Sequence, residues 1–271
     1  MSVIYYIGIL ATLLVSSGNP TISGEKGQGR HLVFTFDDGP SYKTTPLLLD
    51  YLDRLGLKAI FFVNGQRFNG RSHIVKRNLE VLKEVHRRGH KIGNHTYSHP
   101  LMSEVSKKKQ YWQLAKNEKL IEKITGYKPR LYRPPFGQMS YHARVYLKQH
   151  NYSTLMWNLD SEDPFQRHVA KVYANVLSTL YFYKRGLVLM HDTNSWSIEA
   201  VPRIVKAIKL WNCELMARGE PIFEFGDVAD FRLPGENKYK EPDLKMIKKA
   251  YKRRIKMKKW CETIGKGDND S

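Results

Sequence analysis

The residues with the clearest chemical potential in this chain are two adjacent carboxylates, Asp37 and Asp38. They follow an apolar run with the composition of a strand, and neighbouring side chains of a strand point to opposite faces. The next dipeptide, Gly39-Pro40, is expected to end the strand and to let both carboxylates turn toward one pocket. Alone, this tetrapeptide is more typical of a polar turn than of an active site.

A pair of histidines, His95 and His99, follows another short apolar run. Two histidines four residues apart can share one face of a helical turn and hold a divalent metal through their ring nitrogens. One carboxylate of the pair at 37–38 would complete three protein ligands, and the other would stay free as a base. An isolated pair of this spacing is often structural, but the carboxylates expected on the same face favour a metal site.

Two further polar residues follow strand-like runs. Arg133 precedes two prolines, and this rigid turn suits a guanidinium that holds a carboxylate in fixed geometry. A backbone N–H in the same turn can face a developing oxyanion. His191 ends the apolar run 187–190 and can act as a general acid near neutral pH. Each residue alone is compatible with a purely structural role, whereas the combination predicts one catalytic site.

Short apolar runs alternate with helical patterns along most of the chain. The seven runs cover residues 32–36, 59–63, 91–93, 130–132, 153–157, 186–190 and 222–225. Helices are expected over residues 44–55, 72–88, 106–125, 140–150, 168–183 and 197–218. This alternation indicates parallel strands joined by helical crossovers, in an open doubly wound sheet or in a barrel. The chemically suggestive residues all follow strands, so they should gather at one carboxyl-end face.

The composition allows a full core and a strong positive field. Of 271 residues, 41% are hydrophobic, and the formal net charge is +19. The segment 238–259 carries eleven Lys and Arg and two acids, a net of +9, within a C-terminal extension over 231–271. The helical spacing of Leu244, Ile247, Tyr251 and Ile255 predicts a basic amphipathic helix there, packed on the domain or acting as a binding arm. Such a field attracts polyanions of any kind, but no nucleic-acid-binding fold accompanies it, so no specific nucleic acid is expected.

Two features concern the compartment. The apolar run 4–15 and the small residues after it resemble a secretory signal over residues 1–17, and the run is shorter than the roughly 20 residues of a spanning helix. We therefore expect a secreted, periplasmic or cell-envelope protein without a transmembrane span in the mature chain; a buried N-terminal strand is the alternative. Cys213 and Cys261 are too few and too far apart to indicate a disulfide framework, and Cys213 fits a small core residue.

The order and spacing of five motifs resemble the polysaccharide deacetylase family, carbohydrate esterase family four. The motifs cover residues 35–40, 95–100, 133–137, 160–164 and 187–192, within a domain over 30–230. The resemblance implies an α/β fold, a distorted (β/α)7 barrel, and metal-dependent hydrolysis of N-acetyl groups on a glycan.

The resemblance also implies residue roles. Asp38, His95 and His99 would bind a divalent metal, usually zinc (Zn2+), with cobalt (Co2+) or nickel (Ni2+) as alternatives. Asp37 would be the base that activates water, and His191 the acid that protonates the departing amine.

Other residues would support this chemistry. Arg133 would position the base, and Asp163 would tune the acid–base pair. Phe136, where relatives mostly have Tyr, would offer its backbone N–H to the oxyanion, and Leu189 would line the pocket for the acetyl methyl. The expected substrate-binding residues are Pro135, Phe136, Leu189 and Trp196. The fourth motif departs from the family pattern, because Asp163-Pro164 stands where Asp-Trp is usual, and Phe165 and Trp196 are the candidates to replace that wall.

The expected substrate follows from charge and compartment. A basic, exported deacetylase would be attracted to an anionic polymer such as peptidoglycan, whose stem peptides carry carboxylates, and would act on its N-acetylglucosamine. Neutral chitin or chito-oligosaccharide is the first alternative. Hydrolysis of a small-molecule C–N bond and a catalytically weak protein that binds a polyanion or glycan are the others. The pattern specifies no oligomeric state.

Overall fold

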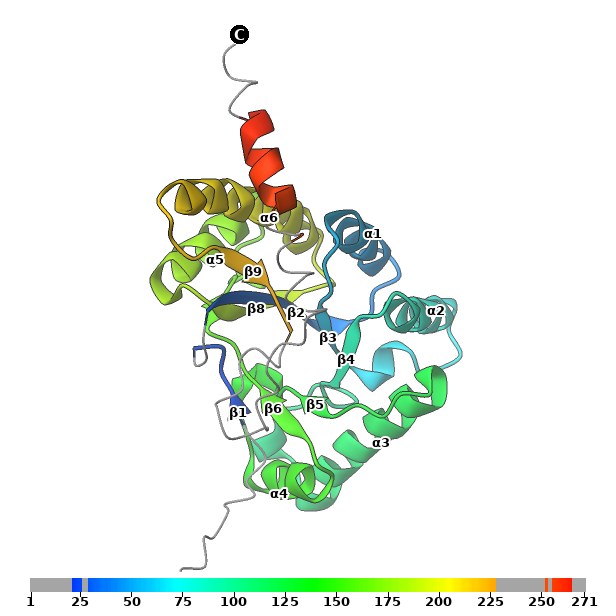
Figure 1. Ribbon diagram of the computed structural model, residues 1–271. Coiled ribbons are helices and arrows are strands. Elements are labelled where there is room, and N and C mark those ends of the chain that lie inside the picture. Colours follow the sequence, from blue (N-terminus) through cyan, green and yellow to red (C-terminus); the bar gives the residue numbers. More distant parts are fainter. Residues whose placement is uncertain (1–20, 26–28, 228–251, 253–254, 265–271) are drawn as a thin grey trace, which may run out of the picture.

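The computed structural model describes residues 21–25, 29–227, 252 and 255–264. Within these residues, nine strands form one curled sheet with only parallel pairings, in the order β1-β6-β5-β4-β3-β2-β8-β7, and β9 also pairs with β2 (Figure 1). The strands are β1 (Thr21–Ile22), β2 (Arg30–Gly39), β3 (Ile60–Val63), β4 (Lys91–Asn94), β5 (Leu131–Tyr132), β6 (Ser153–Leu155), β7 (Leu159–Asp160), β8 (Gly186–His191) and β9 (Phe223–Phe225).

Helices surround the outer side of the sheet (Figure 1). They are α1 (Thr45–Leu55), α2 (His73–Arg87), α3 (Lys107–Thr125), α4 (Tyr141–Gln149), α5 (Val169–Tyr183) and α6 (Ser195–Ala217), with short 3-10 turns η1 (Gly65–Arg67), η2 (Met102–Glu104) and η3 (Pro135–Gly137). Each α-helix lies within two residues of a predicted segment at both ends. Ser72, Ser106 and Ser140 begin three of them, since each hydroxyl accepts a hydrogen bond from the backbone N–H three residues later.

Two apolar layers hold the sheet. The larger lies between the strands and the helices and includes Phe36, Phe61, Leu52, Val205 and Met190. A smaller cluster contains the alternate residues of the same strands, among them Val33, Phe62 and Leu187. Because successive side chains of a strand point to opposite faces, the smaller cluster fills the inside of the curled sheet.

The strand order decides between the doubly wound sheet and the barrel, both of which the sequence allowed. Strands β2 to β6 lie side by side in chain order, and β8 pairs with the other edge of β2. A doubly wound sheet reverses its order in the middle, whereas here the first long strand meets the last, as in a barrel. The predicted distorted (β/α) barrel is confirmed. The sequence analysis does not predict β1 and β7, because their residues lie outside the apolar runs.

The cysteines form a disulfide between Cys213 of α6 and Cys261, with Cα atoms 5.7 Å apart. The expectation that they have no disulfide role, with Cys213 a small core residue, is therefore wrong. Their separation of 48 residues hides the pairing in the sequence, because the fold brings the helical residues 255–264 to α6 (Figure 1).

Two predicted segments fall largely outside the described residues. They are the predicted signal over 1–17 and most of the extension over 231–271, including Leu244, Ile247 and Tyr251. In the described part of that extension, Lys256, Lys258 and Lys259 are exposed. Among the helices of the described residues, none has both the length and the apolar character needed to cross a bilayer.

Candidate active site

Asp37 and Asp38 converge on one side of β2 because the strand is irregular at this point. Asp38 has a φ of 69°, and the pairing of β2 with β3 shifts register between Asp37 and Gly39. As a result, Nε2 of His95 lies 3.7 Å from Oδ2 of Asp37 and 3.6 Å from Oδ1 of Asp38. The sequence predicts convergence by a turn at Gly39-Pro40. The bulge instead lies inside the strand, one residue earlier.

Gly39 is needed at this bulge because Asp192 packs against it. A Cβ added at Gly39 would overlap the carboxylate of Asp192, far inside van der Waals contact. Oδ2 of Asp192 accepts a hydrogen bond of 2.5 Å from Thr45, whereas its buried Oδ1 has no partner. Burial raises the pKa of Asp192 to about 7. A buried acid thus supports the strand end that carries both site carboxylates.

The two histidines reach the site from a loop. Residues 95–99 follow β4 without helical structure, and Thr96 and His99 have positive φ values of 68° and 54°. The hydroxyl of Thr96 accepts a hydrogen bond of 3.1 Å from the N–H of His99, and Oδ1 of Asn94 accepts one of 2.9 Å from the N–H of Thr96. The predicted helical turn is therefore wrong. The loop nonetheless brings the rings of His95 and His99 to 4.9 Å between centres.

His95 is buried and has a defined tautomer. Its Nδ1 lies 2.8 Å from the backbone oxygen of Arg133, and since a carbonyl only accepts, Nδ1 carries the proton. Burial lowers the pKa of His95 to about 3, so the ring is neutral near pH 7 and its Nε2 presents a lone pair. A neutral imidazole oriented in this way is suited to bind a metal.

Asp38, His95 and His99 form a group that fits a divalent metal. Each offers one ligand atom, and these atoms all lie within 4.8 Å of one another. Oδ1 of Asp38 is 3.5 Å from Nε2 of His99, yet this inaccessible oxygen has no hydrogen-bond partner. A buried carboxylate oxygen that faces two imidazole nitrogens needs a cation to satisfy it. Two imidazoles and one carboxylate also match the ligand set of catalytic zinc sites with an open position.

Arg133 is fully buried and holds Asp37. Its Nη1 donates hydrogen bonds of 2.8 Å to Oδ1 of Asp37 and 2.6 Å to the hydroxyl of Thr35. Its Nε and Nη2 donate to the backbone oxygens of Leu155 and Met156. Burial raises the pKa of Asp37, while the guanidinium acts in the opposite direction. The second oxygen of Asp37 therefore remains directed at the metal-capable group.

His191, at the end of β8, forms a pair with Asp163. Its Nδ1–H donates a hydrogen bond of 2.7 Å to Oδ1 of Asp163, and its backbone N–H donates one of 2.9 Å to Oδ2. Asn194 and Ser197 also donate to Oδ2. Burial opposes charge on both groups, but the pairing raises the pKa of His191 to about 9 and holds that of Asp163 below its ordinary value. The resulting imidazolium lies with Nε2 3.9 Å from Oδ2 of Asp38.

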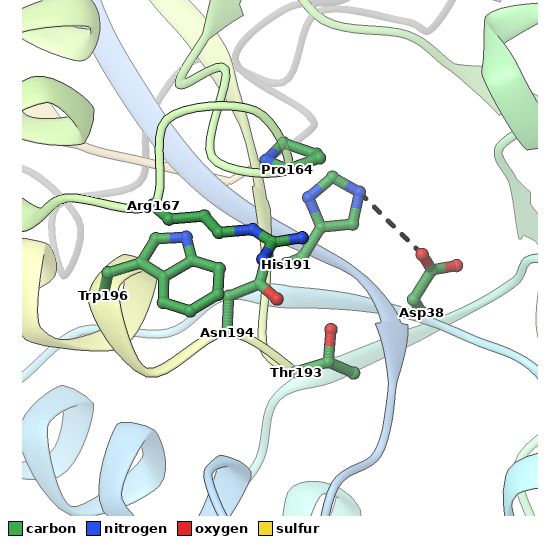
Figure 2. A pocket seen from close by; sticks show the side chains of 7 residues that line it. All are labelled: Asp38, Pro164, Arg167, His191, Thr193, Asn194 and Trp196. Atoms are coloured by element: carbon green, nitrogen blue, oxygen red, sulfur yellow. Dashed lines mark ion pairs between the residues drawn. The ribbon is translucent and has the colours of Figure 1, made fainter.

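A cavity of about 220 Å³ opens beside His191 (Figure 2). Its lining residues are Asp38, Pro164, Arg167, His191, Thr193, Asn194 and Trp196. The indole N–H of Trp196 donates a hydrogen bond of 2.8 Å to the backbone oxygen of Asp163, which fixes this ring at the cavity wall. Phe165, the other candidate for that wall, is 84% exposed and lies outside the lining set.

The other residues predicted to contact substrate lie outside that lining set. Phe136 has a φ of 58°, and its ring packs edge-on against His99, with ring centres 4.6 Å apart. Pro135 is buried at the start of η3. Leu189 precedes His191 by two residues in β8, so both side chains point to the same face of the sheet.

Several positioning residues have no predicted role in the sequence analysis. Thr35 binds Arg133, Asn94 shapes the histidine loop, and Asn194 and Ser197 bind Asp163. Thr35 is a polar residue between Phe34 and Phe36, and Asn94 follows Ile92 and Gly93 at the end of β4; a polar residue in such a place is a usable signal. Asn194 and Ser197 lie at the start of α6, where small polar residues are common as helix caps, so the sequence gives no signal for them.

Comparison with known proteins finds a matching family model and several relatives of similar sequence. A family model described as polysaccharide deacetylase matches residues 24–155. A peptidoglycan-N-acetylglucosamine deacetylase of Bacillus cereus is 31% identical over 182 residues, covering 66% of this chain and 63% of that protein. Another protein of that name and organism is 32% identical over 184 residues, covering 66% of this chain and 81% of that protein. The chain thus spans less than two thirds of the first relative's length.

The fold has a counterpart among solved structures. A crystal structure of a peptidoglycan N-acetylglucosamine deacetylase matches with a TM-score of 0.66 and 26% sequence identity, covering 82% of this chain and 97% of that one. The structural similarity therefore covers a larger share of this chain than the family model, which matches residues 24–155.

Proposed function

Because this chain belongs to the polysaccharide deacetylase family, we propose that it hydrolyses N-acetyl groups on N-acetylglucosamine residues of a cell-wall polysaccharide, most simply peptidoglycan. The observation that carries the proposal is the convergence of Asp37, Asp38, His95 and His99 beside the buried Arg133. All five side chains lie at the carboxyl ends of parallel strands, where barrel enzymes build their sites. The products would be acetate and a glucosamine unit that carries an ammonium group.

Asp38, His95 and His99 would hold a divalent metal. Zinc suits two imidazoles and a carboxylate, and cobalt or nickel accepts the same donors. When bound, the metal would lower the pKa of a coordinated water and polarise the acetamide carbonyl. His95 is available as a ligand without first losing a proton, because burial keeps it neutral.

Asp37 would take the proton of the attacking water. Its Oδ1 is fixed by Arg133, and its Oδ2 faces the metal-capable group at 3.7 Å from Nε2 of His95. Burial raises the pKa of this carboxyl, which makes it a stronger base than an exposed aspartate. Arg133 favours the ionised form, so the residue combines basicity with the charge that a base needs.

His191 would protonate the departing nitrogen. Its raised pKa keeps the ring protonated at neutral pH, and Asp163 holds the ring by Nδ1 so that Nε2 carries the transferable proton. The base lies on β2 and the acid on β8, two adjacent strands with Asp37 opposite His191 in register. A substrate between them can exchange protons with both groups.

The remaining predicted residues would shape the site around the reacting group. The backbone N–H of Phe136 would stabilise the oxyanion of the tetrahedral intermediate. Leu189 would contact the acetyl methyl. Pro135, the ring of Phe136 and Trp196 would contact the sugar, because aromatic and proline side chains offer flat apolar surfaces.

Substrate and compartment are part of the proposal. The names of the relatives support peptidoglycan, and a net charge of +19 favours an anionic polymer over neutral chitin, which is the alternative substrate. The Cys213–Cys261 disulfide supports a secreted or cell-envelope location, because disulfides persist in oxidising compartments.

The test is acetate release from peptidoglycan and from chitin oligomers, with and without a chelator. The variants compared are wild type, Asp37→Asn and the surface control Asp50→Asn. We expect chelator-sensitive release that Asp37→Asn abolishes and the control retains, with peptidoglycan preferred. Release from chitin alone would indicate that chitin, the alternative substrate, is the correct one. If neither glycan releases acetate and the protein is retained on a polyanion column, the protein is a binding protein and not a deacetylase.

A further inference from the structure

We propose that Arg167 binds a carboxylate of the substrate beside the reacting N-acetyl group, and so makes the enzyme selective for acidic glycans. This inference rests on the proposed deacetylation and adds its substrate class. Arg167 lines the same cavity as His191 and Asp38, the residues proposed as acid and metal ligand. In Figure 2 its side chain extends across the cavity toward the side on which His191 lies, with Trp196 next to it.

The Arg167 guanidinium is not neutralised by any residue that the structure describes. Among the described residues, no hydrogen bond or ion pair joins it, although acidic side chains are close in sequence. Those acids bind other groups: Glu162 accepts a hydrogen bond from Asn175, and Asp163 accepts from His191. Asp160 accepts from the indole of Trp157. A cation that lines a catalytic cavity without an internal partner is available to a ligand.

The backbone around Arg167 is ordered by hydrogen bonds. The N–H groups of Phe165 and Gln166 donate to the backbone oxygen of Glu162, at 3.0 and 2.9 Å. The next residue, His168, is the N-cap of α5, since its ring accepts a hydrogen bond from the N–H of Ala170. Arg167 is therefore held between a turn and a helix start, which fixes where its side chain leaves the backbone.

The chemistry of the cavity selects a carboxylate as the ligand. A guanidinium binds carboxylates with two parallel hydrogen bonds, and Thr193 and Asn194 add polar groups to the same wall. Trp196 offers an aromatic surface for the sugar that carries the acid. Peptidoglycan has carboxylates on its stem peptides, and on the lactyl ether of its muramic acid where no peptide is attached, whereas chitin has none.

The charged groups at the reacting centre have other partners, so a separate cation is needed to select an acidic substrate. Arg133 pairs with Asp37, His191 pairs with Asp163, and Asp38 belongs to the group proposed to hold the metal. Arg167 has none of these tasks, and it lines the cavity where a substrate carboxylate can approach it.

The test compares wild type, Arg167→Gln, Arg167→Lys and Arg144→Gln, an exposed arginine of α4 that controls for net charge. Each protein is assayed on three glycans of equal length: neutral chito-oligomer, glycan with free lactyl carboxylates, and glycan with stem peptides. The readout is the ratio of kcat/KM for each acidic glycan to that for the neutral one. Loss of one charge-assisted contact should lower this ratio about tenfold in Arg167→Gln.

The outcomes separate the proposal from its premise. Arg167→Lys should keep part of the ratio and Arg144→Gln all of it. Higher salt should reduce the ratio in wild type and in Arg144→Gln more than in Arg167→Gln. A fall confined to the lactyl glycan or to the peptide glycan identifies the source of the carboxylate. Equal losses on all three glycans, or an unchanged ratio, would overturn the proposal. If wild type releases no acetate at all, the proposed function fails, and binding of the acidic glycan to wild type and Arg167→Gln then decides the role of Arg167 separately.

Discussion

His95 and Arg133 are joined by a hydrogen bond of 2.8 Å between the imidazole Nδ1 and the backbone carbonyl of Arg133. The same arginine binds Asp37 through its guanidinium. One residue therefore orients a metal-capable imidazole with its backbone and a neighbouring carboxylate with its side chain. A side-chain substitution at this position removes the second contact and leaves the first.

Replacing Arg133 by Lys should therefore separate metal binding from catalysis. We expect kcat/KM for acetate release to fall about 100-fold, the scale of a misplaced general base, while metal affinity changes little because His95 keeps its carbonyl partner. The measurements are steady-state kinetics and competition with a metal-binding dye. The protein should also lose about 3 kcal/mol of stability, because a lysine cannot make the four hydrogen bonds of the buried guanidinium. Parallel loss of metal and activity would contradict the separation.

Zinc should stabilise the protein as well as activate it. A ligand present at about 100 times its dissociation constant adds about 2.7 kcal/mol to the free energy of unfolding, and the melting temperature should rise by several degrees. His99→Ala removes one of the three ligand atoms and should abolish most of this rise. The control is His142→Ala, which changes a histidine of α4 outside the site. An equal rise in both variants would place the metal elsewhere.

The pair of His191 and Asp163 predicts the alkaline limb of the pH profile. With a pKa of about 9, His191 is protonated at neutral pH, and acid catalysis is lost as the pH rises through that value. Asp163→Asn removes the negative charge that stabilises the imidazolium, so the limb should move to lower pH and activity at pH 7 should fall. Ser197→Ala keeps the charge and removes only one donor to Asp163, so its limb should stay near that of wild type. Identical profiles for all three proteins would remove His191 from the role of acid.

The helices of this fold could be predicted because their signals are local. Ser72, for example, is a cap that the sequence shows directly, and the apolar spacing after it defines α2. The site could be located for a similar reason, since Asp37, His95 and His191 all follow apolar strands and parallel strands bring their carboxyl ends together.

Other features depend on contacts that a single sequence does not display. The left-handed conformation of Asp38 and the bent loop at Thr96 depend on packing and on hydrogen bonds from residues distant in the chain, such as Asn117 to Asn94. The pairing of Cys213 with Cys261 likewise depends on where the chain returns to α6. Residue spacing predicted a helical turn for the histidines and no pairing for the cysteines, because spacing contains no information about contacts between distant parts of the chain.

The disulfide gives a prediction that does not involve catalysis. Cys213 and Cys261 should resist alkylation in the folded protein and react fully after reduction, which intact-mass measurement detects. Cys213 lies in the helical layer outside the sheet, away from the strand ends, so the double variant with serine at both positions should retain acetate release. Alkylation of both thiols without reductant would show that the pair is open, and would remove the disulfide as support for an oxidising compartment.

Asp192 predicts how stability depends on pH. Burial raises its pKa from 3.8 to about 7 in the folded protein, so the fold favours the protonated form. A group whose folded pKa is raised contributes stability that is full below its unfolded pKa and is lost as the pH rises through the folded value. Asparagine at this position cannot ionise. The free energy of unfolding of Asp192→Asn, relative to wild type, should therefore increase by about 2 kcal/mol between pH 5 and pH 8.

Denaturant unfolding at the two pH values measures this difference, and Glu104→Gln, an exposed acid in η2, controls for net charge. A difference that is constant with pH would mean that Asp192 is ionised in the fold at pH 5, with a cation or a donor compensating its unpaired Oδ1.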